Sequence, residues 1–236
     1  MEKTFKSIIP DKYFPWLIDI KNNCFRRFKK SYYSQFGEDI VLTKLLKENR
    51  GFYVDVGAYH PKHFSNTYLL FKKGWKGINI DPSIYTIKLF KKYRKHDVNL
   101  QIGISEVPNT GVFYMFSHSN WNTFSKEKVE EWKNKSGTHY LGEQQIQCLP
   151  LREVLNKYMP TNREIGLLNI DAEGLDMEVL QSNDWIKYLP KVVIVECASF
   201  DLAHPEQSPV YSFLLAKNYR LYSFLGLSLI FVKNGK

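Results

Sequence analysis

The sequence predicts an α/β domain built on a mostly parallel, doubly wound sheet that ends in an antiparallel hairpin. Short apolar runs at 51–58 and 77–82 end in a carboxylate or a glycine turn, which is typical of strands buried in a parallel sheet. Strand-like and helix-like segments alternate along most of the chain, as they do where right-handed crossovers join parallel strands. The last two strand-like runs are separated only by a turn at Gly226, which favours a hairpin at the edge of the sheet.

The first half of the chain begins with a polar segment at 34–39 and an amphipathic helix from Ile40. Asp81 closes the second apolar run, and Pro82 after it suits the first turn of a helix. A helix is therefore expected directly after the second strand. The expected strands in this half are 52–55, 76–80, 98–104 and 111–116, and the expected helices lie near 64–73, 83–94 and 125–134.

In the second half, two apolar strand-like runs each end next to acidic residues. The first is followed by Asp171 and Glu173, and the second ends in Glu196. Helix-like patterns separate these runs, so both strand ends are expected at the same edge of the sheet. The expected strands are 166–170, 191–196, 219–223 and 228–233, and the expected helices lie near 150–158, 174–181 and 208–217.

The composition suits one domain at 31–236, preceded by a basic and aromatic extension at 1–30. The chain has 236 residues, of which 44% are hydrophobic and 15% aromatic, so it has enough apolar material for a packed core. Its three cysteines are widely spaced without a CxxC pair, which favours a reducing compartment over a disulfide framework or a cysteine zinc site. No apolar run suits a signal peptide or a membrane span, so a cytoplasmic protein is expected.

The formal net charge of +9 leaves several partners open. Basic residues are concentrated at 26–30 and at 88–95, where Arg94 and four lysines crowd one short segment. The simplest interpretation is a solvated helix face. The alternatives are attraction of a phosphorylated or acidic glycan, peripheral contact with an anionic membrane or with glycan-assembly enzymes, and binding of RNA. We expect no DNA partner, and the oligomeric state is open.

Gly57 and Asp81 together predict a cofactor that contains adenosine. Gly57 follows the first strand, and a residue without a Cβ lets the backbone approach a ligand closely. Asp81 lies at the tip of the second strand, where a carboxylate can accept hydrogen bonds from both hydroxyls of a ribose. A nicotinamide dinucleotide is the weaker candidate, because the loop lacks the GxGxxG pattern.

Seven short motifs in a fixed order carry a resemblance to a known family. They are QFGED at 35–39, VDVGA at 54–58, SNT at 65–67, GWKG at 74–77, IDP at 80–82, LNIDAEG at 168–174 and GLSLIFV at 226–232. Over residues 31–233 the chain resembles the FkbM family of class I methyltransferases. The resemblance implies a Rossmann-like fold and S-adenosylmethionine as the cofactor. His60 and Pro61 depart from the pattern, because many relatives carry a small residue and a glycine there.

The cofactor candidates come partly from the residues and partly from this resemblance. Asp55, Gly57 and Ala58 are expected at the amino-acid end of S-adenosylmethionine, where loop amides would meet its carboxylate. The alternatives are a structural βα turn for this loop and a helix N-cap for Asp81. The resemblance adds the adenine edge at 102–105. The full set of cofactor candidates is Gln35, Asp55, Gly57, Ala58, Asn66, Asp81, Gly103 and Ile104.

The acidic strand ends are candidates for catalysis or for metal binding. Asp171 and Glu196 form a plausible oxygen-ligand pair for Mg²⁺ or Mn²⁺, because a carboxylate at the end of an apolar strand is costly to bury alone. The alternative is an acid pair that orients the acceptor or caps a helix. The candidates for a catalytic base or acid are Asp171, Glu173, His204 and His118.

The segment 117–149 is long, polar and aromatic, and we expect it to cover the acceptor. Aromatic faces beside polar side chains suit sugar rings, and this segment holds Trp121, Trp132 and Tyr140. The hypothesis is an O-methyltransferase that acts on a saccharide hydroxyl, such as a nucleotide-linked sugar or a capsular or lipopolysaccharide glycan; the saccharide acceptor rests on the family resemblance alone. The alternatives are an RNA methyltransferase, a non-catalytic adenosine-nucleotide-binding scaffold in a glycan-assembly complex and, least favoured, a nicotinamide oxidoreductase.

Overall fold

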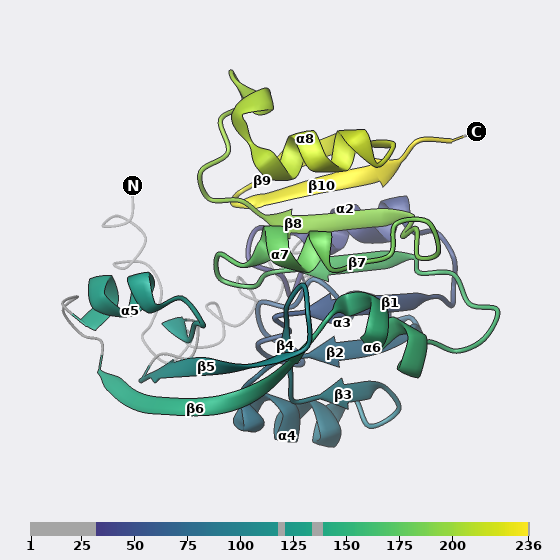
Figure 1. Ribbon diagram of the computed structural model, residues 1–236. Helices are drawn as coiled ribbons and strands as arrows, with labels where there is room; N and C mark the ends of the chain where they lie inside the picture. Colours follow the sequence, from purple (N-terminus) through teal and green to yellow (C-terminus); the bar gives the residue numbers. More distant parts are fainter. Residues whose placement is uncertain (1–31, 118–120, 134–138, 236) are drawn as a thin grey trace, which may run out of the picture. The chain divides into compact units, whose positions relative to one another are not determined.

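The structure is a computed structural model that describes residues 32–117, 121–133 and 139–235 (Figure 1). Contacts within the chain divide it into one unit at 1–32 and a second at 33–236. The account below concerns the second unit. The predicted extension at 1–30 and the base candidate His118 lie outside the described residues.

The main sheet has seven strands in the order β3-β2-β1-β7-β8-β10-β9 (Figure 1). All of them run parallel except β10, which is antiparallel to both β8 and β9. The predicted fold class is confirmed, with the C-terminal hairpin turning at Gly226, whose φ is +62°. The strands are β1 (Phe52–Val56), β2 (Lys76–Ile80), β3 (Val98–Leu100), β7 (Leu167–Ile170), β8 (Val192–Glu196), β9 (Tyr219–Leu225) and β10 (Ser228–Lys233).

Helices cover both faces of this sheet because alternate residues of each buried strand pack on opposite sides. Val54 and Val193 belong to the core under α6, α7 and α8, whereas Tyr53 and Ile194 belong to the core under α2 and α3. A further helix, α4, contacts β3 at the sheet edge. The helices are α2 (Glu38–Leu45), α3 (Tyr68–Lys72), α4 (Ile84–Tyr93), α6 (Leu151–Tyr158), α7 (Asp176–Gln181) and α8 (Pro209–Ala216).

A second sheet of three strands, in the order β4-β6-β5, projects beyond the carboxyl ends of the main strands (Figure 1). Its strands are β4 (Gly103–Ile104), β5 (Asn109–Phe116) and β6 (Tyr140–Leu149), and α5 (Lys126–Lys133) lies between β5 and β6 in the chain. We call residues 103–149 the arm. The single strand expected at 98–104 is in fact two strands that belong to different sheets.

Two further elements differ from the expectations. The strand β6 was not expected at all, because it is rich in Glu and Gln and buries only Ile146 and Cys148 fully. The helix expected near 64–73 begins only at Tyr68, since residues 59–67 form a loop. A short 3₁₀ helix, η3 (Pro205–Gln207), precedes α8. Within the described residues, no helix has both the length and the apolar character to cross a bilayer.

Candidate functional site

A cavity of about 640 Å³ opens where β1, β2, β7 and β8 end and the arm begins. This volume lies within the roughly 300–1,000 Å³ that is usual for small-molecule sites. All eight cofactor candidates line it, and so do Asp171, Glu173 and Glu196. The chain therefore brings together, around one space, nearly all the residues that its strand ends predicted.

The glycine loop after β1 is fixed by its own backbone. The amides of Gly57 and Ala58 both donate to the carbonyl of Ile80, at 3.0 and 3.1 Å. The expectation that these two amides meet the carboxylate of a cofactor is therefore not supported, because both already have a partner. Gly57 has a φ of +75°, and a Cβ there would lie 1.7 Å from the carbonyl oxygen of Asp171. Only glycine fits this close approach.

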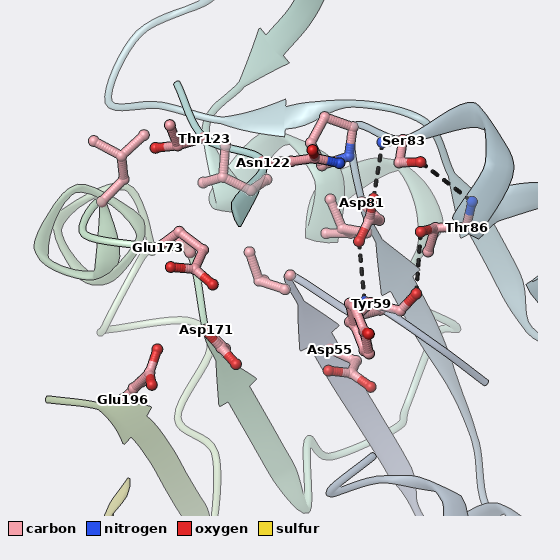
Figure 2. A pocket seen from close by; sticks show the side chains of 18 of the residues that line it. Asp55, Tyr59, Asp81, Ser83, Thr86, Asn122, Thr123, Asp171, Glu173 and Glu196 are labelled. Carbon is pink, nitrogen blue, oxygen red and sulfur yellow. Dashed lines mark hydrogen bonds between the residues drawn. The ribbon is translucent and has the colours of Figure 1, made fainter. Parts of the chain in front are cut away.

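Asp81 is buried at the tip of β2 and accepts two backbone hydrogen bonds. Its Oδ1 accepts from Ser83 N at 2.8 Å, and its Oδ2 accepts from Tyr59 N at 3.0 Å (Figure 2). Each carboxylate oxygen can accept a further bond. Burial raises the pKa of Asp81 to about 6. The N-cap of α4 is Ser83, whose Oγ accepts from Thr86 N, so Asp81 is not needed as the cap.

The arm forms the wall above Asp81. Gly103 packs so closely that a Cβ would lie 2.6 Å from Cys148 Sγ and 2.9 Å from the ring of Phe124. Asn122 accepts from Phe116 N at 2.8 Å, and Figure 2 shows Asn122 and Thr123 between the two sides of the pocket. Sequence reasoning missed the 122–124 segment as a lining element, because it treated this region only as a cover for the acceptor.

Three carboxylates, which we call the acid cluster, face Asp81 from the ends of β7 and β8 (Figure 2). One ligand oxygen from each of Asp171, Glu173 and Glu196 lies within 4.8 Å of the others. The Oδ1 atom of Asp171 is buried and has no hydrogen-bond partner among the described residues. Burial, and then the charge of Glu196, raise the pKa of Asp171 well above its usual range.

Glu173 is the member of the acid cluster that lies beside a lysine. Burial and the charge of Glu196 raise its pKa to about 7, while the ammonium group of Lys128 opposes the shift. Lys128, on α5, donates to the backbone carbonyl of Glu173 at 2.7 Å and lies 3.7 Å from its Oε2. Glu173 also has a φ of +51°, a strained value of the kind that clusters at functional sites. The arm is thus tied to the acid cluster through one lysine.

Comparison with known families agrees with this geometry. The family described as the methyltransferase FkbM domain matches residues 55–221, from Asp55 in β1 to Leu221 in β9. The chain belongs to the FkbM methyltransferase family. The predicted resemblance is thereby confirmed. No curated protein and no solved structure matches this chain.

In this FkbM methyltransferase, both carboxylate oxygens of Asp55 take part in a buried hydrogen-bond network. Its Oδ1 accepts from Asn169 Nδ2 at 2.8 Å, and its Oδ2 accepts from Thr67 Oγ1 at 2.6 Å. Asn66, a cofactor candidate, donates to Asn169 Oδ1 at 2.8 Å. Asp55 and Asn66 still line the cavity, but in the structure their polar atoms join β1, β7 and the 59–67 loop.

Arg94 stands at the centre of the same network and corrects the sequence interpretation. It was grouped with the lysines of a solvated helix face, whereas its side chain is fully buried. Its guanidinium donates to the carbonyl of Pro61 at 2.6 and 3.0 Å, to Ser65 Oγ at 2.8 Å and to Thr67 Oγ1 at 2.7 Å. It also opposes the rise that burial imposes on the pKa values of Asp55 and Asp97. Nothing local in the sequence distinguishes it from its basic neighbours.

The structure does not bring the histidine candidate His204 into the site. It precedes η3 in an exposed loop, where its Nδ1 lies 3.8 Å from a carboxylate oxygen of Glu206, and it does not line the cavity. Of the segment from Glu196 to His204, only Glu196 lines the cavity. A residue eight positions beyond Glu196 is therefore too far along the loop to reach the site. At this end of the cavity the acid cluster supplies three titratable side chains to the lining.

Proposed function

We propose that this methyltransferase transfers the methyl group of S-adenosylmethionine to a hydroxyl of a saccharide. The observation that carries the proposal is the cavity itself, which places a carboxylate suited to a ribose opposite a cluster of carboxylates suited to an acceptor. Because one cavity of about 640 Å³ joins these two ends, both substrates of a methyl transfer would bind in it side by side. Membership in the methyltransferase family makes the methyl donor the natural cofactor.

The cofactor would lie along the ends of β1 and β2. Asp81 retains acceptor capacity on both oxygens, and so can take the two ribose hydroxyls. Gly103 and Ile104, with the Phe124 ring beside them, offer a flat apolar wall for the adenine. Gln35 lines the same cavity from the segment before α2. These residues support an adenosyl ligand from three separate elements.

The acceptor would lie between the arm and the acid cluster. Trp121 and Trp132 line the cavity there, with ring centroids 5.4 Å apart. Aromatic faces pack well on the apolar faces of sugar rings, and the carboxylates opposite can accept hydrogen bonds from sugar hydroxyls. A saccharide therefore matches both walls.

The chemistry is an in-line displacement at the methyl carbon. The acceptor oxygen forms a bond to the methyl group, the carbon–sulfur bond breaks, and the sulfur keeps the electron pair to give neutral S-adenosylhomocysteine. The hydroxyl proton needs a base, and Glu173 is the best matched, because its pKa of about 7 lets it take a proton near neutral pH. The walls of the cavity would align the reacting atoms, a contribution that reaches roughly 7–11 kcal/mol in the best intramolecular reactions.

The acid cluster also fits Mg²⁺ or Mn²⁺. Its three side chains are all carboxylates, which these ions prefer, and Asp171 Oδ1 has no hydrogen-bond partner among the described residues. When bound, the ion would lower the pKa of an acceptor hydroxyl. Asp171 and Glu196 would hold it.

The first test is calorimetric titration of S-adenosylhomocysteine into the protein in EDTA, and then with Mg²⁺ or Mn²⁺. Asp81→Ala is expected to abolish binding, while Asp184→Ala, which removes a carboxylate outside the cavity, should leave it unchanged. Metal-dependent heat that Asp171→Ala removes would support the ion site. Absence of binding by the wild-type protein in every buffer would refute the cofactor.

The acceptor is tested separately, with labelled S-adenosylmethionine and panels of free sugars, nucleotide sugars, glycans, lipids and RNA. Transfer to a saccharide that Glu173→Gln strongly reduces is the expected result. Transfer to RNA alone, or to no acceptor despite tight cofactor binding, would overturn the saccharide assignment.

A further inference from the structure

The loop 59–67 holds two aromatic residues in a backbone conformation that L-residues rarely adopt. Tyr59 has a φ of +54° and Phe64 a φ of +52°, and both line the cavity. A bulky side chain in this left-handed region is a genuine outlier, and such strain persists only where the surroundings fix it. The strain therefore calls for a cause outside the local sequence.

The loop is fixed on both sides of Phe64. On one side, Tyr59 donates its amide to Asp81 Oδ2 at 3.0 Å and accepts from Thr86 Oγ1 at 3.0 Å (Figure 2). On the other side, the Ser65 amide donates to the carbonyl of Tyr33 at 3.0 Å, and Arg94 donates a hydrogen bond to Ser65 Oγ at 2.8 Å. The phenyl ring of Phe64 is therefore presented by a rigid frame.

The ring itself gains little from the protein. Phe64 is 63% exposed, and the ring contact recorded for it is with Tyr59, at 6.3 Å between centroids. A glycine would adopt the same backbone without strain. Neither folding nor packing thus explains an aromatic side chain here. An apolar ring at the mouth of a cavity becomes buried only when a ligand covers it.

We propose that Phe64 is a cofactor-contacting residue whose ring covers the adenosyl ligand on the side of Asp81. This inference rests on the proposed function. The ligand is the cofactor and not the acceptor, because Tyr59, which touches Phe64, is bonded to Asp81, whereas the acid cluster lies across the cavity (Figure 2). The ring offers an apolar face for the ribose and the methylene groups beside it, and an aromatic face attracts the sulfonium charge of the methyl donor.

The test uses calorimetry with S-adenosylhomocysteine and thermal unfolding of the same variants. Phe64→Gly removes the ring and relieves the strain, so we expect about tenfold weaker binding with an unchanged or higher Tm. Phe64→Ala should weaken binding equally while the backbone strain stays. Phe64→Tyr keeps a ring and should bind within about threefold of the wild type. Asn162→Gly is the matched control, since Asn162 also has a positive φ, of +62°, but does not line the cavity.

The outcomes separate this inference from the proposed function. If the wild-type protein fails to bind the ligand, the cofactor assignment falls and this inference falls with it. If the wild type binds and Phe64→Gly binds as tightly, only the role of Phe64 is overturned. A Phe64→Gly protein that loses affinity and Tm together also overturns it, because the ring would then be structural. Weaker binding at an undiminished Tm, with Asn162→Gly unaffected, is the supporting result.

Discussion

Replacement of Arg94 by methionine tests whether the buried network holds the 59–67 loop and the strand ends together. Methionine fills a similar space without a charge or donors. The change removes the donors to the carbonyl of Pro61 and one of two donors to Ser65 Oγ. It also removes the cation that opposes the rise in the pKa values of Asp55 and Asp97. Removing one member of a buried charged network costs about 3–5 kcal/mol. Because whole domains are stable by only about 5–15 kcal/mol, the loss should be plain.

The size of this loss should depend on pH. Burial raises the pKa values of Asp55 and Asp97 in the folded protein, and Arg94 opposes the rise. Without Arg94 both values rise further, so the ionised carboxylates destabilise the folded state more. That penalty is absent below the unfolded pKa near 4 and grows as the pH rises. The deficit of Arg94→Met should therefore be larger at pH 8 than at pH 5.

The assay is urea unfolding followed by circular dichroism at both pH values. Lys91→Met is the matched control, because Lys91 is an exposed cation on α4, the helix whose C-cap is Arg94. It should change the free energy of unfolding by no more than about 0.5 kcal/mol. Arg94→Lys keeps the charge but not the planar set of donors, so its free energy of unfolding should lie between those of Arg94→Met and Lys91→Met. An Arg94→Met protein within about 1 kcal/mol of Lys91→Met, at both pH values, would refute the reasoning.

Three further predictions concern the pocket. In the proposed function Asp81 would bind the ribose as a carboxylate, and its pKa is about 6. Titrations from pH 8 to 5 should therefore show an affinity for S-adenosylhomocysteine that is constant above pH 7 and about tenfold weaker per pH unit below 6. Asp81→Asn should remove this dependence, and a flat wild-type profile would contradict it. Gly57→Ala should lower the free energy of unfolding by about 4 kcal/mol, or prevent folding, because its Cβ would lie 1.7 Å from the Asp171 carbonyl oxygen. A denaturation assay that finds wild-type stability would disprove this. Asp171→Asn should raise the Tm at pH 8, because it removes a carboxylate whose raised pKa makes its ionised form destabilising. The same variant should abolish any rise in Tm on adding Mg²⁺. A Tm below that of the wild type would argue against both expectations.

The sequence was sufficient to predict the main sheet and most of the site. Strands buried on both faces are continuous apolar runs, and the parallel topology places their carboxyl ends at one edge. Asp81, Asp171 and Glu196 could therefore be assigned to one cavity from their positions alone. The hairpin at Gly226 was predicted from the short turn between the last two strand-like runs, and Gly226 has a positive φ there.

The remaining features depend on partners that are distant in sequence. The strand β6 takes its conformation from its long pairing with β5, not from its own polar composition. Arg94 is buried because its partners in the 59–67 loop are 27 to 33 residues away. The same bonds prevent residues 64–67 from continuing the helix that their neighbours indicated. His204 was misplaced because the course of an exposed loop leaves no periodic signal.

The close approach of Gly57 to Asp171 also has a thermodynamic consequence. The loop after β1 and the loop after β7 touch through their backbones, so neither can shift without displacing the other. Binding of a ligand at the ends of β1 and β2 would therefore change the affinity of a ligand at the acid cluster, and the reverse. Such coupling is reciprocal: whatever factor the first occupant applies to the affinity of the second, the second applies to the first. This contact between two loops would then make the binding of one occupant change the affinity for the other.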